Sequence, residues 1–491
     1  MYPSVLDACR GFVRSLRSKV EQAGGGRARV DHFSDFLTAL TADAVVKCAI
    51  GLDMRNVARL SRGEPPHAFI PAFRFGLKYA AGGATSSDLP AAVRYNPLVS
   101  NARALSEKYE DAKRTCAEIV EDMVERTRLG ELGGCGGDGS CPSGSGNRAD
   151  TVSSASSPGG GGGTSVLATM LNDRAPNGKL IRLGAIQGHV LNLMIAGHET
   201  TAATIGFVVY YLSRHPEWER RVVDEARTVL AGRTEPAAAD LRRLVVAEAV
   251  FREALRLHPP VVVLTRDASA DTTLAQGRYV VRRGQRVMCL LPALHRRDDV
   301  WGSGSGYPDP EAFDPSRFIP GDERAKGRPA NAFSPWGFGQ RACIGSQFAL
   351  MEAKCLLCLL YSQLCVGTPE GYVAVPSTAD GGAAPVPKGL SVLLYPRAGA
   401  PDVAAAAAAA DGTAEGTKAE AAVAPASAAP AASSAAPPVR SIPIRILYGS
   451  NGGTCESFAS SLAQRAAQLG FSATAEPLDA AADGSLAAPA G

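Results

Sequence analysis

The most apolar window of the chain, VLNLMIAGHETTAATIGFVVYYL at residues 190–212, constrains its fold most strongly. The window is long enough to cross a bilayer, yet His198 and Glu199 stand near its middle. A charge at mid-bilayer depth is costly, so a helix buried in a protein core is the better interpretation. We therefore predict a globular protein with this helix inside it.

Composition agrees with that interpretation and excludes some partners. The chain has 491 residues, of which 45% are hydrophobic and 20% charged, as in ordinary globular proteins with two or three domains. A formal net charge of +3 from 51 basic and 48 acidic residues gives no reason to expect nucleic acid or an anionic membrane as a partner.

The first residues and the cysteines bear on localisation. The opening segment MYPSVLDACRGFVRSL carries charges too early to form the apolar part of a signal peptide. Eleven cysteines in a chain without a secretion signal are most simply reduced thiols. We therefore expect a cytoplasmic protein.

Helical patterns dominate the first half of the chain. They fill residues 1 to about 128 and resume from about 166 to 260. Between them, residues 129–165 are rich in Gly and Ser and hold too few apolar residues to pack. We expect a disordered surface insert there, with Cys135 and Cys141 as free thiols.

The second half changes character. Short strands and a hairpin are predicted over residues 261–295, and residues 296–342 are rich in loops, Gly and Pro. The segment QFALMEAKCLLCLLYSQL is apolar on nearly every side, which predicts a fully buried helix. Core packing is the expected role of its Cys355 and Cys358.

The last part of the chain looks like a linker followed by the start of another domain. Residues 398–440 are rich in Ala, Pro and Ser, as interdomain linkers are. Residues 441–491 then offer a strand (IPIRILYG), a short loop (SNGGT) and a helical pattern (ESFASSLAQRAAQLG).

One cysteine, Cys343, stands in a distinctive loop, FSPWGFGQRACIGSQFALMEAK. Just ahead of a helix, its sulfur would lie where unpaired N–H groups and the helix dipole favour a negative charge. Gly339 and Gly345 let the backbone turn sharply and approach a flat ligand, and Arg341 can pair with an anionic group. A thiolate in such a setting suits a haem iron, with Arg341 on a propionate. The plain alternative is a buried cysteine before a core helix.

WGFGQRACIG closely resembles the haem-binding loop of the cytochrome P-450 family, in which an aromatic residue, Gly, Arg, Cys and Gly occur at these spacings. The resemblance implies the cytochrome P-450 fold, mainly α with small β-sheets, and haem b with Cys343 as axial ligand of the iron. Where the family usually has Phe, this chain has Trp336, whose larger ring and N–H donor would alter the electronic environment of the iron.

A second motif, AGHETT at residues 196–201, lies in the long apolar helix. Thr200 can donate a hydrogen bond to the carbonyl of Ala196, which bends or opens a helix, and the small Ala196 leaves room for a ligand. It resembles the family's central helix over the haem, in which an acid–alcohol pair aids proton delivery. By position Glu199 and Thr200 take those catalytic roles. The alternative is an ordinary core helix with a partly buried Glu and a back-bonded Thr.

Three further residues match the family's structural ion network. EALR places Glu253 and Arg256 on one face of a helix, and FDPSRF supplies Arg317. The resemblance implies that these three support the haem loop. It also implies that Arg266 reaches a haem propionate and that residues 261–264 line an apolar substrate pocket.

The tail has its own resemblance. YGSNGGT closely resembles the FMN-phosphate loop of flavodoxin-like reductase domains, which implies phosphate contacts from Ser450, Asn451, Gly452, Gly453 and Thr454. Together with the haem loop it resembles the self-sufficient P-450–reductase fusions, which hydroxylate fatty acids with electrons from NADPH through FAD and FMN. The family's haem domain normally begins earlier, and its flavin domains are longer. We therefore expect a fragment or incomplete gene model, with FAD and NADPH on a missing reductase part.

Three functions remain open from the sequence. The leading one is a haem-thiolate monooxygenase that inserts one oxygen atom from O2 into an apolar substrate such as a fatty acid, with a fused reductase domain as electron donor. The second is a P-450-like isomerase of fatty hydroperoxides, which needs no electrons. The third is an inactive haem-domain remnant.

Overall fold

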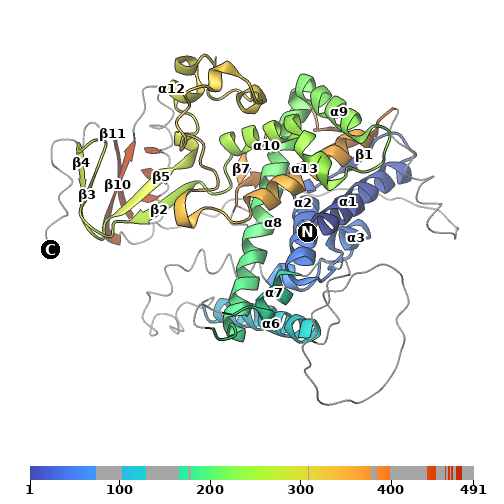
Figure 1. The fold of residues 1–491 in the computed structure, drawn as a ribbon, viewed down its shortest axis with the longest axis horizontal. Coiled ribbons are helices and arrows are strands. Elements are labelled where there is room, and N and C mark those ends of the chain that lie inside the picture. The colour runs from blue at the N-terminus through green and yellow to red at the C-terminus, as the bar shows by residue number, and fades with distance from the viewer. Residues whose placement is uncertain are drawn as a thin grey trace, which may run out of the picture. The chain divides into compact units, whose positions relative to one another are not determined.

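The structure is a computed structural model, drawn as a ribbon in Figure 1. It falls into two compact units. Residues 1–254 and 344–400 belong to the first unit, and residues 255–343 and 401–491 to the second. The residues that the structure describes are 1–72, 102–128, 165–174, 178–307, 309–377, 384–398, 440–448, 459–460, 463–464, 466–467 and 471–477.

Helices make up most of the described chain. The α-helices are α1 (Tyr2–Gln22), α2 (Phe33–Ile50), α3 (Asn56–Ser61), α6 (Ala102–Arg128), α7 (Val166–Asn172), α8 (Leu183–Arg214), α9 (Pro216–Leu230), α10 (Val245–Leu257), α11 (Leu291–Leu294), α12 (Asp298–Trp301) and α13 (Ser346–Gln363). Short 3-10 helices are η1 (Ala238–Arg243), η2 (Ser303–Ser305), η3 (Pro315–Phe318), η4 (Glu323–Ala325) and η5 (Gly339–Arg341).

The strands are short and form several small sheets. They are β1 (Ala28–Val30), β2 (Val263–Asp267), β3 (Thr272–Leu274), β4 (Tyr279–Val281), β5 (Arg286–Leu290), β6 (Leu364–Gly367), β7 (Pro376–Ser377), β8 (Val386–Pro387), β9 (Val392–Pro396), β10 (Arg440–Tyr448) and β11 (Phe471–Pro477). The order β1-β9-β6 makes a three-stranded antiparallel sheet, and the pairs β2-β5, β3-β4 and β7-β8 are also antiparallel.

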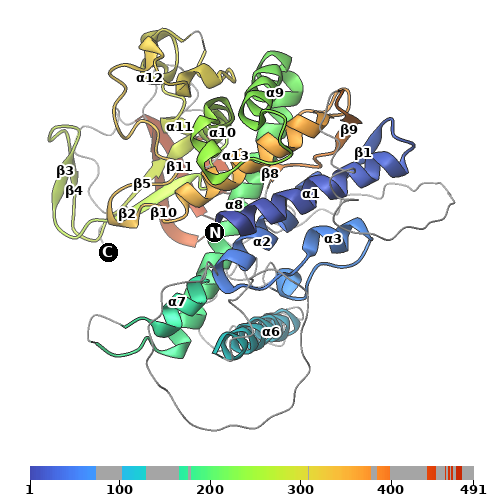
Figure 2. The ribbon, with the colours of Figure 1, turned by 45° about the vertical axis from the view of Figure 1, so that its right-hand side comes forward.

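The first unit is built on two helix pairs, α1 with α13 and α2 with α8, which lie side by side in Figures 1 and 2. The helix α1 is amphipathic and buries one stripe: Val5, Cys9, Phe12, Val13, Leu16 and Val20. The helix α2 is buried along most of its length because α1, α3 and α8 all pack against it. It ends at Gly51, which has φ 80° and donates its N–H to the carbonyl of Lys47.

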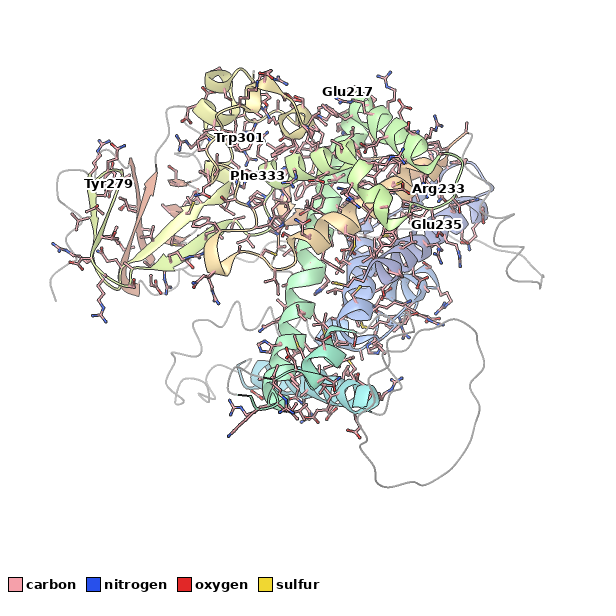
Figure 3. All side chains as sticks on the ribbon, viewed as in Figure 1. Glu217, Arg233, Glu235, Tyr279, Trp301 and Phe333 are labelled. Carbon is pink, nitrogen blue, oxygen red and sulfur yellow. The ribbon has the colours of Figure 1, made fainter. Side chains whose placement is uncertain are left out.

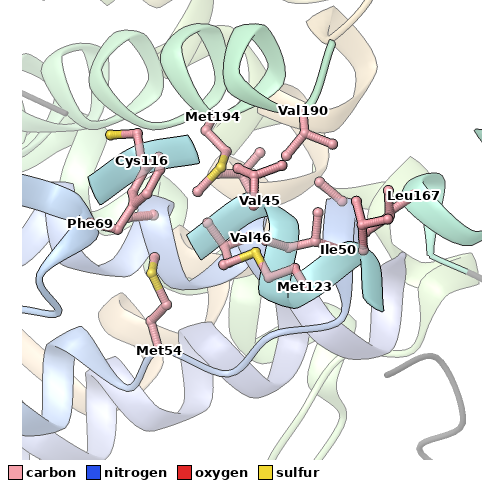
Figure 4. Close-up of a cluster of buried hydrophobic side chains, with 14 of the residues drawn as sticks. Val45, Val46, Ile50, Met54, Phe69, Cys116, Met123, Leu167, Val190 and Met194 are labelled. Atoms are coloured by element: carbon pink, nitrogen blue, oxygen red, sulfur yellow. The ribbon is translucent and has the colours of Figure 1, made fainter. Parts of the chain in front are cut away.

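A large apolar cluster joins α2, α6, α7 and α8 (Figure 4). Methionine and aliphatic side chains fill it, and its labelled members are Val45, Val46, Ile50, Met54, Phe69, Cys116, Met123, Leu167, Val190 and Met194. Burial of these apolar side chains holds one face of α8 against α2.

The sequence predicted this architecture well in outline. Helices do dominate residues 1–128 in the described part of the chain, and short strands occur within 261–295, where β3 pairs with β4 and β2 with β5 rather than β4 with β5 across Gly284. The helix α13 is buried from Glu352 onward. The three-residue strand β1 was not predicted, because its pairing with β9 joins segments more than 360 residues apart. The predicted insert, 129–165, lies outside the described residues except for Ser165, whose hydroxyl accepts the N–H of Ala168 and caps α7.

The close approach of α2 and α8 gives a first prediction. A Cβ added to Gly197 would lie 2.5 Å from Cγ2 of Val45, so Gly197→Ala should destabilise the fold by about 1–3 kcal/mol. The double variant Gly197→Ala, Val45→Ala should recover most of that loss in urea unfolding.

Gly188 of the same helix is the matched control, because nothing lies within 4 Å of its added Cβ. Gly188→Ala should stabilise by about 0.5–1 kcal/mol, since alanine has the higher helix propensity. Equal effects of Gly197→Ala and Gly188→Ala would contradict close packing at Gly197.

A buried carboxyl on α13 gives a second prediction. Glu352 is fully buried, neither of its carboxyl oxygens has a hydrogen-bond partner in the described part of the chain, and burial raises its pKa to about 8. Between its ordinary pKa of 4.5 and about 8, the unfolded chain loses this proton while the folded chain keeps it. The free energy of unfolding is therefore highest, as far as Glu352 is concerned, below pH 4.5. It falls as the pH rises toward 8, by at most about 1.4 kcal/mol per pH unit.

Glu352→Met should flatten this part of the stability curve and raise the free energy of unfolding at pH 8 relative to the wild type. Urea titrations at pH 5 and pH 8 measure both effects. An unchanged difference between the two pH values in the variant would show that another group titrates there.

Candidate functional site

In the first unit, the helix α8 has one buried and one open face. Ile186, Val190 and Met194 are buried in the cluster with α2, whereas Ala196 is exposed and Thr200 half-buried. The expected local feature is present, because the Thr200 hydroxyl donates to the carbonyl of Ala196 at 2.8 Å. The helix is continuous from Leu183 to Arg214, so this hydrogen bond does not break it into two helices.

His198 and Glu199 are both buried, in contrast to Thr200 beside them. His198 Nδ1 lies 2.6 Å from the carbonyl oxygen of Met194, and Nε2 lies 3.9 Å from Oε1 of Glu199. The hydroxyl of Thr41 donates to the carbonyl of His198 at 2.7 Å and ties this turn of α8 to α2. The carboxyl group of Glu199 is thus buried, and the hydroxyl of Thr200 lies on the more exposed face of α8.

In the second unit, Cys343 closes a tight loop. Gly337 and Gly339 both have φ 67°, a left-handed backbone that favours glycine. The N–H of Gly337 donates to the carbonyl of Ser334 at 3.0 Å, and the N–H of Cys343 donates to the carbonyl of Trp336 at 2.8 Å. These two hydrogen bonds bring the ends of the loop together.

The thiol of Cys343 differs from the other described cysteines. It is free and exposed, whereas the others are buried or half-buried: Cys9, Cys48, Cys116, Cys289, Cys355, Cys358 and Cys365. The alternative of a buried cysteine before a core helix is therefore wrong. An exposed thiol at the end of a constrained loop is available to a ligand.

Gly345 and Gly339 turn the backbone in different ways. Gly339 has φ 67°, whereas Gly345 has φ −92° and ψ 5°, a turn conformation open to any residue. It is the N-cap of α13. The second left-handed position is Gly337. A loop with several glycines does not indicate in its sequence which of them takes positive φ.

The side chains around the loop are placed as follows. The Trp336 ring is half-buried and packs edge to face on Phe333, with ring centroids 6.0 Å apart. Arg341 is exposed at the end of η5. Arg266 is exposed as well and lies over the Phe338 ring, 5.7 Å from its centroid. The roles of Trp336, Arg341 and Arg266 toward a haem stay predictions.

Glu253, Arg256 and Arg317, predicted to support the haem loop, are all fully buried. Arg256 donates to the carbonyls of His295 (3.0 Å), Pro310 (2.5 Å) and Ala312 (3.0 Å). Arg317 donates to two further carbonyls, those of Trp301 (2.8 Å) and Asp309 (2.6 Å). The two arginines thus hold the irregular segment 295–312 through its backbone.

The predicted FMN-phosphate residues, Ser450, Asn451, Gly452, Gly453 and Thr454, lie outside the described residues. Around them β10 pairs in parallel with β11, and residues 459–460, 463–464 and 466–467 are helical. Parallel neighbours require a crossover connection, and these helical residues lie between the two strands in the chain. The strand β11 was not foreseen.

Comparison with known proteins settles the family. The cytochrome P450 family matches residues 153–389, a range that includes the Thr200 motif, the buried arginines and the Cys343 loop. The chain belongs to the cytochrome P450 family. In the described part of this P450, the fold is mainly helical with small sheets, as the sequence predicted.

Two curated relatives show what kind of P450 it resembles. It is 34% identical to bifunctional cytochrome P450/NADPH–P450 reductase 2 of Bacillus subtilis (strain 168) over 64% of this chain and 27% of the relative. It is 28% identical to the self-sufficient cytochrome P450 monooxygenase CYP505E3 of Phanerodontia chrysosporium over 98% of this chain and 40% of that one. The chain thus spans well under half the length of these relatives.

Solved structures agree on the fold. The crystal structure of the cytochrome P450DA heme domain aligns with a TM-score of 0.62 and 26% identity, covering 80% of this chain and 73% of that one. A cytochrome P450 described as CYP102L1 aligns with a TM-score of 0.64 and 23% identity, covering 80% and 76%.

The residues of this P450 fit the haem that the family implies. The free, exposed thiol of Cys343 is the type of ligand that haem iron accepts, and nothing lies within 4 Å of where a Gly339 Cβ would stand. Arg341 and Arg266 are exposed cations of the kind that pair with propionates.

None of the helices in the described part of the chain is long and apolar enough to traverse a bilayer.

The loop geometry gives a third prediction. Because the Cβ of a residue at 339 would meet nothing within 4 Å, Gly339→Ala introduces backbone strain without a clash. A left-handed alanine costs about 1–2 kcal/mol, so the melting temperature should fall. Gly339→Asn is the control, since asparagine tolerates this conformation better and should cost less. If the alanine and asparagine variants melt together, φ at 339 does not limit stability.

Proposed function

We propose that this chain is the haem-bearing part of a monooxygenase that inserts one oxygen atom from O2 into an apolar substrate, fatty acids being the favoured class. The main support is the Cys343 loop: a free, exposed thiol at the end of a turn built on two left-handed glycines. The names of the relatives, which include a self-sufficient monooxygenase, support the same reaction class.

Bound haem would supply the activation of O2, and the chain's own residues would hold the group and manage protons. Cys343 would provide the axial sulfur, and Arg341 and Arg266 would pair with the propionates. The Thr200 hydroxyl donates a hydrogen bond to the carbonyl of Ala196, so its oxygen could accept a hydrogen bond from a proton donor on the open face of α8. Glu199, held beside His198, would be the nearby acid.

The roles of Glu253, Arg256 and Arg317 in this proposal are structural. Arg256 and Arg317 donate to five backbone carbonyls between them, and Glu253 is fully buried one helical turn before Arg256. They would keep the segment that precedes the Cys343 loop in a fixed conformation.

We also propose that residues 1–397 form the haem domain, 398–440 a linker, and 441–491 the beginning of a flavodoxin-like FMN domain. The parallel pairing of β10 with β11 supports this division, since a flavodoxin-like sheet is parallel. The alignment with the CYP505E3 protein covers 98% of this chain and so includes most of the tail. Electrons would then come from NADPH through FAD and FMN of a fused reductase.

The first experiment tests the thiolate ligand. The full chain, expressed with a haem precursor, should show the carbon monoxide difference spectrum of a thiolate-bound haem. Cys343→Ala should lose that spectrum, and Cys289→Ala, a half-buried cysteine of β5, should keep it. A thiolate spectrum that survives Cys343→Ala would remove the basis of the proposal, and no haem binding at all would favour an inactive remnant.

The second experiment tests the reaction. With a P450 reductase, NADPH and a fatty acid, oxygen from labelled O2 should enter the product. Thr200→Ala should lower the rate by about 10²-fold or more, as expected for loss of proton-transfer catalysis, and Thr200→Ser should restore it. Conversion of a fatty hydroperoxide without NADPH, together with no oxygenation, would identify an isomerase instead.

A further inference from the structure

His295 belongs to the second unit, and the sequence predicts no role for it. Its side chain is fully buried just after α11, between Leu294 and Arg296 in sequence. The backbone N–H of Ser334, 39 residues later, donates to its Nε2 at 3.0 Å. Ser334 is the first residue of the turn that leads to Cys343.

The direction of this hydrogen bond fixes the tautomer. A backbone N–H can only donate, so Nε2 carries a lone pair and the proton of the neutral ring is on Nδ1. Burial, reinforced by the charge of Arg256, lowers the pKa of His295 to about 3. The ring is therefore a neutral hydrogen-bond acceptor around neutral pH.

A series of contacts leads from His295 to Cys343. The His295 ring packs on Phe333, with centroids 5.3 Å apart, and Phe333 packs in turn on Trp336 at 6.0 Å. The carbonyl of Ser334 accepts the N–H of Gly337, and the carbonyl of Trp336 accepts the N–H of Cys343. His295 thus contacts Phe333 and Ser334, the residues at which the turn that leads to Cys343 begins.

The backbone of His295 is itself fixed from the other side. Arg256 donates to the carbonyl of His295 at 3.0 Å while it also binds the carbonyls of Pro310 and Ala312. The ring of Trp301 lies 5.4 Å from the Arg256 guanidinium and packs edge to face on Phe333 at 6.1 Å. Trp301 and Phe333 are labelled in Figure 3. The backbone that carries the His295 ring is therefore held in place by Arg256.

We propose that His295 is a positioning residue for the haem ligand. Its ring binds the backbone at the start of the Cys343 loop, and Arg256 fixes the backbone of His295, so the loop is connected to the segment 295–312 that Arg256 holds. Arg256 itself is hydrogen-bonded to the carbonyls of that segment, and His295 is the residue of the segment whose side chain reaches Ser334. The inference rests on the proposed haem-binding function for its consequence, but the contact with Ser334 can be tested separately.

The test compares two pairs of variants in the full chain. His295→Phe keeps a ring against Phe333 but has no acceptor, and His295→Gln places an amide oxygen at about the reach of Nε2. His295→Asn is as polar as the glutamine but too short to reach Ser334. If the phenylalanine variant fails to fold, the asparagine and glutamine pair still decides the question.

The first measurement is hydrogen exchange of the Ser334 amide, which needs no haem. We expect exchange at least tenfold faster in His295→Phe and His295→Asn than in wild type, and protection restored in His295→Gln. Val281→Ala, in the buried part of β4, is the comparator for a general loss of stability in the same unit. If the Phe and Asn variants exchange no faster than Val281→Ala, His295 does not hold the loop.

The second measurement is haem affinity with the carbon monoxide spectrum. Residues that orient a metal ligand typically change metal affinity by about 10-fold to 100-fold when removed, and we expect a loss of this size together with a partial loss of the thiolate spectrum. His295→Gln should recover both. Faster Ser334 exchange with unchanged affinity and spectrum would overturn the positioning role, whereas failure of the wild type to bind haem would overturn the proposed function and leave the exchange result intact.

Discussion

The burial of α13 is the constraint on which the first unit depends. Its sequence is apolar nearly all round, so it cannot lie at a surface and must be covered on every side. Most of the cover comes from distant parts of the chain, since α1, α8 and α9 all pack against it. Its few polar side chains are costly to bury, and Lys354 is paired with Glu248 of α10 at 2.6 Å. The helix that follows the Cys343 loop is therefore among the most fully fixed elements of the chain.

The second unit solves a different problem. Between α11 and the Cys343 loop the chain is almost without regular structure, so its carbonyls cannot satisfy one another in a ladder. Two buried guanidinium groups, those of Arg256 and Arg317, satisfy some of these carbonyls instead, because together they donate to five backbone oxygens. The rings of Trp301 and Tyr307 lie against these charges, with Tyr307 4.3 Å from Arg317. A fixed but irregular backbone is what allows a loop to present one exposed thiol.

This arrangement gives a physical meaning to motifs that look weak in the sequence. A Glu and an Arg three residues apart usually form a surface pair of little value. Here Arg256 is fully buried and organises main chain 39 to 56 residues away. The same holds for His295, whose ring reaches Ser334 and which no spacing rule would have selected.

The sequence by itself determined the family, the mainly helical fold with small sheets, the buried helices around residues 198 and 355, and Cys343 as the candidate ligand. These depend on local patterns: apolar periodicity, glycine placement and a contiguous loop motif. Only the tertiary structure decided that Gly337 rather than Gly345 shares the left-handed conformation with Gly339, that α8 stays continuous through Thr200, and that His295 holds the loop. The glycine conformations depend on how the loop closes in three dimensions, and the contact of His295 with Ser334 joins residues 39 apart in the chain. A local pattern carries no information about either.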